Sequence, residues 1–461
     1  MNKNYYLAID IGASSGRHVL AWREGEGIAM QEIYRFSHHA VAYGDGWIWD
    51  IEQMKTHVVN GLKKCREIGI IPCGIGIDTF GVDYALLNAK GEILGNVHSY
   101  RDLRTLPAKA EVARHLSERD QFQKTGIQPQ VFNTIYQLMA DRMSGKLADA
   151  DQILLLPSYL TYFLTGVPHN ESTIASTTGL LDLTTGGWNE ELLDLLDLTP
   201  VQFAPLVLPG SRIGSLTASI QEAVGFDSTV YAVGAHDTAS AVLGSLCDRN
   251  TAFLSSGTWS LLGLTLPQPI VTEEARQNGF TNEVGVGGTI RFLKNIMGLW
   301  MVQEVRREQE VVLSYPEIAE LAAHHRDYSG HVDVTDQRFL SPVSMTEAIK
   351  GFLRETHQPE PANLGELYFC LYRSLAMEYA KTLRQLEDLR QRPISALNII
   401  GGGSQNALLN ELTEQTTHKK IIAGPVEATA LGNVLAQMIA SREVEDIAHA
   451  RVLAEATRLM E

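Results

Sequence analysis

One pattern occurs twice in this chain: an apolar strand, a turn of small residues, and a second apolar strand. The first copy spans residues 5–22 and the second spans 251–263. Such a pattern is typical of a β-hairpin. Because strands and helices alternate through the rest of the chain, the duplication predicts two α/β domains of similar plan that face each other across a cleft. We expect the domains to cover residues 1–245 and 246–461.

The helix after the first hairpin carries the clearest local signals. Asp50 is a candidate N-cap, Ile51, Met54, Val58 and Leu62 recur at helical spacing, and Gly69 ends the pattern. The sequence predicts further strands at 29–36, 73–77, 230–236, 394–400 and 420–422, and a second hairpin at 84–91. It predicts helices over most of 103–165 and at 239–246, 363–389, 406–416 and 428–440.

The charge of the chain limits its partners. Over 461 residues the formal net charge is −16, with 44% hydrophobic and 20% charged residues. Such a surface repels nucleic acid and anionic membranes, so any anionic ligand must be held by backbone N–H groups, a metal ion or a few placed cations. No apolar run is long enough to span a bilayer and we recognise no signal peptide, so we expect a cytoplasmic protein. The cysteine spacing does not fit a zinc site, and the sequence leaves monomer or homodimer open.

The two small-residue turns are candidate phosphate-binding loops. In the first, Asp10–Arg17, backbone N–H groups can approach an anion closely, Asp10 could hold Mg²⁺ through water, and Arg17 could reach a phosphate oxygen. With the second turn, Ser255–Thr258, it could clamp a polyphosphate such as ATP. The alternatives are an ordinary hairpin turn and a mere duplication of the fold. No Walker loop occurs in the chain.

A third candidate is the run Gly401–Asn406, which lies between a strand and a helix. Three consecutive glycines permit close approach of a flat ligand such as a nucleotide base or its sugar, although a tight turn is the alternative. The run is not Gly-x-Gly-x-x-Gly, so a Rossmann dinucleotide site is disfavoured.

Asp237 is the candidate proton acceptor. It follows a predicted strand at the start of a helix, where the helix dipole stabilises a carboxylate. It could accept the proton of a substrate hydroxyl during phosphoryl transfer, and the alternative is a simple N-cap. Asp78 and Asp83, in a strand-end loop, suit sugar hydroxyls, and the alternative is a simple turn. The polar pair Lys294 and Asn295 lies in an apolar stretch, 290–301, and needs partners or a ligand there.

Seven segments in this order resemble the FGGY family of carbohydrate kinases, of the sugar kinase, Hsp70 and actin superfamily. They lie at 10–17, 76–83, 235–242, 254–261, 293–300, 400–406 and 423–433. The resemblance covers nearly the whole chain and implies two ribonuclease H-like domains that flank a catalytic cleft. It further implies that ATP and Mg²⁺ are the cofactors and that a small sugar is the substrate.

The resemblance also implies a role for each matching residue. Asp237 would accept the proton of the sugar hydroxyl, and Asp10 would organise Mg²⁺. The sugar site would be lined by Gly81, His236, Thr238 and Asn295, joined by Asp83 from the argument above. ATP would be bound by Ala13, Ser14, Ser15, Gly16, Arg17, Thr258, Gln303 and Gly402.

The form of the first turn, Ala13–Arg17, indicates the branch of the family that phosphorylates L-rhamnulose at its 1-hydroxyl, a step of L-rhamnose breakdown. Phe80 stands where we expect Trp, which indicates a slightly different sugar pocket. Two alternatives stay open: a kinase for another ketose, L-fuculose or L-xylulose, and a non-enzymatic nucleotide-binding member of the superfamily.

Overall fold

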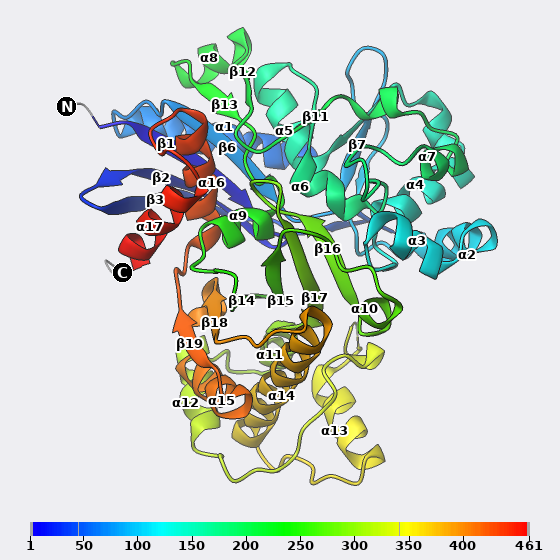
Figure 1. Cartoon of the computed structure of the whole chain (residues 1–461), viewed down its shortest axis with the longest axis vertical. Coiled ribbons are helices and arrows are strands. Elements are labelled where there is room, and N and C mark those ends of the chain that lie inside the picture. Colours follow the sequence, from blue (N-terminus) through cyan, green and yellow to red (C-terminus); the bar gives the residue numbers. More distant parts are fainter. Residues whose placement is uncertain (1–2, 45, 341, 459–461) are drawn as a thin grey trace. The chain divides into compact units, whose positions relative to one another are not determined.

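The computed structural model describes residues 3–44, 46–340 and 342–458, which form two compact units (Figure 1). Unit 1 draws on Met1–Gly244, Leu266–Phe292 and Ala428–Glu461, and unit 2 draws on Ser245–Thr265 and Leu293–Glu427. The chain therefore enters unit 1 three times. No helix among the described residues is both long and apolar enough to cross a membrane.

Unit 1 is built on a six-stranded sheet of order β12-β13-β6-β1-β2-β3. Its strands are β1 Tyr5–Ile11, β2 Ser15–Glu24, β3 Gly27–Ser37, β6 Gly74–Thr79, β12 Arg212–Ser215 and β13 Thr229–Tyr231. β1 and β2 form the predicted antiparallel hairpin, and β6 runs parallel to β1 on its other side. This register sets Asp10 opposite Asp78 at the ends of the two strands.

The core of unit 1 follows from the apolar patterns. Helix α1 (Ile51–Glu67) begins as predicted, with the Asp50 side chain accepting a hydrogen bond from the Gln53 N–H. Its apolar side chains at helical spacing are buried with those of β1, which is covered along almost its whole length. Helix α16 (Ala428–Ala440) packs against β1 and β6, so the C-terminal part of the chain helps to close unit 1.

Unit 2 repeats this plan, and its strands belong to a six-stranded sheet of order β16-β17-β15-β14-β18-β19, whose edge strand β16 is Phe280–Val284. Its strands are β14 Thr251–Ser256, β15 Trp259–Leu266, β17 Ile290–Met297, β18 Ala396–Ile400 and β19 Lys420–Ala423. β14 and β15 form the second predicted hairpin, and β18 and β19 follow in parallel, as β6 and β13 follow β1. The predicted duplication is confirmed. The long helix α14 (Leu364–Arg390) packs against α15 (Ala407–Thr417) and α12 (Tyr315–Ala323).

The remaining elements are shorter. The strands are β4 Val41–Tyr43, β5 Gly46–Trp49, β7 Tyr84–Leu87, β8 Val97–His98, β9 Gln152–Leu155, β10 Asn170–Glu171, β11 Leu206–Val207 and β16 Phe280–Val284. The helices are α2 Thr105–His115, α3 Glu118–Thr125, α4 Thr134–Met143, α5 Leu156–Thr165, α6 Ser172–Ala175, α7 Glu190–Leu195, α8 Ala218–Val224, α9 Asp237–Leu243, α10 Glu273–Gln277, α11 Trp300–Arg307, α13 Met345–Glu355 and α17 Ile447–Arg458.

The strand predicted at 230–236 is wrong in its second half, because β13 ends at Tyr231. The backbone beyond it makes isolated bonds to backbone and side chains instead of a continuous strand ladder; for example, the Thr79 N–H donates to the Ala235 carbonyl at 2.9 Å. The Ser240 hydroxyl donates to the Gly234 carbonyl at 2.7 Å, and the Ala235 N–H donates to the Glu171 carboxylate at 3.1 Å. The Glu171 bond is made only once a segment 64 residues away has met this loop, so local sequence does not reveal it.

Two other predictions need correction. The turn after Leu87 forms, but β7 pairs with β9 over residues 152–155, and the return strand is reduced to a single bridge at Ile93. The mainly helical interpretation of 103–165 therefore missed β9, a short apolar run that sequence alone does not separate from a buried helix. The apolar stretch 290–301 is a strand, β17, followed by the start of helix α11.

Candidate active site

The first predicted phosphate turn is closed and fastened to the end of β3. The Gly12 N–H donates to the Ser15 carbonyl at 2.9 Å, and the His38 N–H donates to the Ser14 carbonyl at 3.2 Å. The His38 ring adds a second bond, because its Nε2 lies 2.6 Å from the Gly12 carbonyl oxygen. A Cβ at Gly16 would lie 2.2 Å from the Phe36 ring, which explains this glycine. Our sequence reasoning missed His38.

Carboxylates gather where β1 and β6 end. The Arg17 Nε lies 2.9 Å from an Asp10 carboxylate oxygen, and Asp10 is 6% exposed. Asp78 is fully buried and accepts a 2.5 Å hydrogen bond from the Asn433 amide. Burial raises the pKa of Asp78, and the neighbouring Asp10 and Asp237 raise it further. Asp78 thus lies next to Asp10 on the neighbouring strand and is fully buried, so the prediction that it binds sugar hydroxyls is wrong.

Asp237 is the first residue of α9, so the predicted helix start is confirmed. The N-cap position belongs to His236, which removes the alternative that Asp237 is only a cap. The Thr238 hydroxyl donates to the Asp237 carboxylate at 3.0 Å, and the His236 Nε2 lies 3.5 Å from the same oxygen. Burial raises the pKa of Asp237, His236 and the Thr238 bond oppose this, and Asp10 adds to it.

The loop before α9 rests on a buried carboxylate. Glu171 is 1% exposed and accepts hydrogen bonds from the Thr173 hydroxyl and from the Ala235 N–H. The Thr173 oxygen in turn accepts from the His236 N–H at 3.3 Å. Gly81 lies in front of this loop, because a Cβ there would meet the His236 Nε2 at 3.4 Å. Gly81, His236, Asp237 and Thr238 are therefore brought together.

Asp83 does not lie open beside them. It is 1% exposed, and its carboxyl accepts hydrogen bonds from the Trp49 indole at 2.7 Å, the Gln137 amide at 2.9 Å and the Tyr100 N–H at 3.1 Å. Burial raises its pKa to about 7, although these three donors oppose the shift. Phe80 packs between Trp49 and Tyr100. Asp83 therefore joins the segments that carry Trp49, Gln137 and Tyr100 through its buried carboxyl.

Two charged residues that our sequence reasoning missed lie against His236. Arg291, at the start of β17, is fully buried, and Glu283 on β16 is 6% exposed. A guanidinium nitrogen of Arg291 lies 2.9 Å from the Glu283 carboxylate. The signal available in the sequence was an arginine inside the apolar stretch 290–301.

In unit 2, Thr258 and Gln303 come together. The Leu299 N–H donates to the Gly257 carbonyl at 3.0 Å, and the Trp300 N–H donates to the Thr258 carbonyl at 3.1 Å. The start of α11 is thereby docked on the second small-residue turn. The Thr258 hydroxyl lies 3.4 Å from the Gln303 side-chain oxygen.

Each of the three consecutive glycines is explained by a different feature of the structure. Gly401 has a φ of 80°, and a Cβ at Gly403 would lie 2.0 Å from the Ser256 hydroxyl oxygen. Both are needed for close packing of this turn on the end of β14. A Cβ at Gly402 would meet no described atom within 4 Å. Only Gly402 therefore has open space in front of it, where a ligand can approach.

Of the predicted polar pair in β17, Lys294 has a charged partner within the protein. The Lys294 ammonium forms a buried ion pair with Glu378 on α14 at 2.9 Å. Asn295 is half-buried in unit 2.

The acidic end of β1 fits a water-coordinated divalent cation. Mg²⁺ prefers oxygen ligands and keeps several waters. The buried Oδ1 of Asp78 receives no hydrogen bond from any residue that the structure describes, next to the Asp10 carboxylate. In the same described residues, no group of three or more His, Cys, Asp and Glu side chains is arranged to hold a metal directly.

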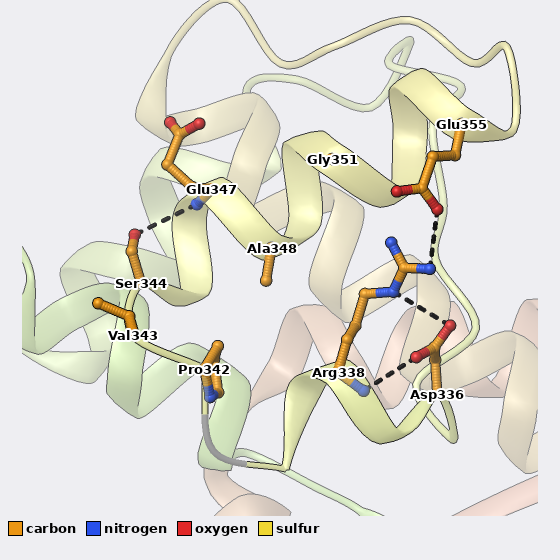
Figure 2. Close-up of a pocket in the computed structure, with 9 residues that line it drawn as sticks. All are labelled: Asp336, Arg338, Pro342, Val343, Ser344, Glu347, Ala348, Gly351 and Glu355. Atoms are coloured by element: carbon orange, nitrogen blue, oxygen red, sulfur yellow. Dashed lines mark hydrogen bonds and ion pairs between the residues drawn. The ribbon is translucent and has the colours of Figure 1, made fainter.

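A separate pocket lies on unit 2 around α13 (Figure 2). The Arg338 guanidinium at its wall pairs with Asp336 at 3.2 Å and with Glu355 at 2.8 Å. Its lining, as far as the structure describes it, includes none of the predicted sugar or ATP residues. Both carboxylates thus already share the one cation in its lining.

Family models and relatives show which family the chain belongs to. The N-terminal domain model of the FGGY family of carbohydrate kinases matches residues 5–244, and the C-terminal domain model matches residues 252–441. The chain belongs to the FGGY family of carbohydrate kinases. A protein named rhamnulokinase from Enterococcus faecalis is 44% identical over 98% of this chain and 92% of that protein. One of the same name from Bacillus subtilis is 42% identical over 97% and 92%.

Solved structures share the fold of this family member. A gluconate kinase from Lactobacillus acidophilus matches with a TM-score of 0.81 at 14% identity, over 98% of this chain and 92% of that one. A Plasmodium falciparum glycerol kinase with ADP matches with a TM-score of 0.77 at 14% identity over the same shares. The predicted two-domain α/β fold of the superfamily is confirmed.

Proposed function

We propose that this chain transfers the γ-phosphoryl group of ATP to the 1-hydroxyl of L-rhamnulose, giving L-rhamnulose 1-phosphate and ADP. The relatives named rhamnulokinase, which align over nearly the whole chain, support this substrate. The observation that carries the chemistry is the Asp237 carboxylate at the start of α9, flanked by Thr238 and His236, with Gly81 close to the His236 ring.

Asp237 orients the sugar hydroxyl and accepts its proton. Burial and the neighbouring Asp10 raise the pKa of Asp237, which makes its carboxylate a better base than an exposed one. The transition state of phosphoryl transfer is loose and the proton leaves late, so a carboxylate is a sufficient base. His236 and Thr238 position the ketose, with Gly81 leaving room for it and Asn295 as a further contact. Asp83 supports the wall of the sugar site.

The remaining predicted residues bind the nucleotide. Backbone N–H groups of Ala13, Ser14, Ser15 and Gly16 and the Arg17 guanidinium contact phosphate oxygens. Thr258, Gln303 and Gly402 bind the rest of ATP. Asp10 would hold Mg²⁺, which when bound would supply positive charge for the transferring group. In this division residues 1–245 carry most of the sugar site and the first phosphate hairpin, and residues 246–461 carry the second phosphate hairpin and the site for the adenosine of ATP. ATP is a cytoplasmic cosubstrate, so we place the reaction in the cytoplasm.

The test uses the intact chain and two variants. We expect ADP release from Mg-ATP to depend on L-rhamnulose, and the Asp237→Asn and Asp237→Ala variants to lose about 10²-fold or more in kcat. Both variants should still bind ATP, measured by calorimetry. Full turnover in either variant would remove Asp237 from its role, and ADP release that ignores the sugar would contradict the function.

A further inference from the structure

The starting point is a fully buried ion pair beside the sugar site. Arg291 has no exposed side-chain surface, and its Nη1 lies 2.9 Å from the Glu283 carboxylate. Burial lowers the pKa of Arg291, and the carboxylates of Glu283, Asp237 and Glu171 oppose that shift. Burial likewise acts to raise the pKa of Glu283, but Arg291 and His236 hold it below its ordinary value. A guanidinium keeps its proton in proteins, and its charge favours the carboxylate form of Glu283.

This pair meets one nitrogen of His236. The Arg291 Nη2 lies 3.1 Å from the His236 Nδ1, and a Glu283 oxygen lies 3.2 Å from the same atom. The Arg291 contact is a hydrogen bond in which the guanidinium can only donate, and the Glu283 carboxylate lies closer to the Arg291 Nη1 than to the ring, so Nδ1 presents its lone pair to Arg291. The His236 proton then resides on Nε2, the nitrogen that faces Gly81 and the Asp237 carboxylate.

The orientation of Arg291 is itself fixed. Its Nε donates to the Val284 carbonyl at 3.2 Å, so the guanidinium is held at both ends. A buried ion pair often gives little net stability against apolar residues of the same volume, which makes stability alone a weak reason for it. The contacts of the Arg291–Glu283 pair supply a different reason, because they fix the tautomer and the ring angle of His236.

We propose that Arg291, held by Glu283, is a positioning residue that keeps His236 with its Nε2–H directed at the sugar. In this role His236 is a fixed donor to a ketose oxygen, while Asp237 accepts the proton of the reacting hydroxyl. The inference rests on the proposed function, because it assigns the orientation of a residue in the same sugar site. The pair would thus act on sugar binding and turnover and leave ATP binding alone.

A double-mutant cycle tests this. The single variants are Arg291→Met, which removes the donor, and His236→Gln, whose amide keeps a donor near Nε2 but loses Nδ1. We expect Arg291→Met to lower kcat/KM for L-rhamnulose about tenfold or more, with the KM for ATP changed by less than about twofold. In the His236→Gln background the same change should cost less than about twofold. Glu283→Gln, a milder change, should give a smaller loss of the same kind.

Lys419→Met is the control for loss of an ion pair. Lys419 pairs with Glu387 at 2.6 Å and precedes β19. It lies near the start of β18, whereas Gly401–Gly403 follow the end of that strand. It should leave both KM values unchanged. Three results would overturn the proposal. The first is additive losses of kcat/KM in the cycle, and the second is an equal effect on the KM values for sugar and ATP. The third is wild-type kinetics in both Arg291→Met and Glu283→Gln. If Arg291→Met does not fold, Glu283→Gln replaces it in the cycle. Should the wild-type chain ignore L-rhamnulose, the proposed function fails separately, and the cycle is run on the ketose it does phosphorylate.

Discussion

Gly432 on α16 lies against α9, the helix that begins with Asp237. A Cβ at Gly432 would lie 1.8 Å from the Ser240 carbonyl oxygen and 2.9 Å from the Gly244 nitrogen. Both contacts are with backbone atoms, so a change of side-chain rotamer cannot relieve the clash. The Gly432→Ala substitution therefore forces the two helices apart.

The size of the effect follows from that distance. A carbon and a carbonyl oxygen approach to roughly 3.3 Å, so α9 has to move by more than about 1 Å. Overpacking of this kind destabilises a core by about 1–3 kcal/mol. A misplacement of about 1 Å at catalytic groups costs on the order of 10²-fold in rate, so we expect kcat to fall by at least tenfold.

The assay pairs urea denaturation with steady-state kinetics. Gly351→Ala on α13 is the matched control, because a Cβ there would meet no described atom within 4 Å. It should change kcat little and stabilise the helix by up to about 1 kcal/mol. A Gly432→Ala protein that unfolds at the wild-type midpoint and turns over at the wild-type rate would refute the reasoning.

Three further predictions follow from other residues. His38→Ala leaves the Gly12 carbonyl without this hydrogen bond and should raise the KM for ATP several-fold. His38→Gln keeps a donor and should restore a KM close to the wild-type value. Equal KM values for the two variants in ATP titrations would contradict this. Lys294→Met leaves Glu378 buried without its closest cation and should cost about 3 kcal/mol in urea denaturation, and an unchanged midpoint would count against the pair. Burial lowers the pKa of His18 from 6.5 to about 3, so the unfolded chain takes up the proton first and stability falls as pH drops through this window, by up to about 1.4 kcal/mol per unit. His18→Gln should flatten this slope in denaturation at several pH values, and an equal slope would exclude His18 as its source.

The sequence was sufficient where the signal is local. The hairpin β1–β2, helix α1 and the start of α9 at Asp237 all follow from turn residues, caps and periodicity within about ten residues. The duplicated plan followed because β14–β15 repeats the first hairpin. The resemblance to the FGGY family then gave the fold and the candidate residues.

The supporting residues were beyond the sequence because they act across long separations. Glu171 holds the Ala235 N–H from 64 residues away, and Arg291 meets His236 from 55 residues away. Asn433 reaches Asp78 across 355 residues. No local pattern marks such contacts, and the Glu171 bond to Ala235 contributes to the early end of the predicted strand at 230–236.

The central claim is tested most directly by comparing ketoses in a coupled ADP-release assay with Mg-ATP. The panel holds L-rhamnulose, L-fuculose, L-xylulose, D-xylulose and D-fructose at matched concentrations. We predict a kcat/KM for L-rhamnulose at least about tenfold above every other sugar, because differences of a few contacts in a built polar site discriminate by this much or more. A higher kcat/KM for another ketose would contradict the substrate, and no turnover of any sugar by a chain that binds ATP would contradict the kinase function itself.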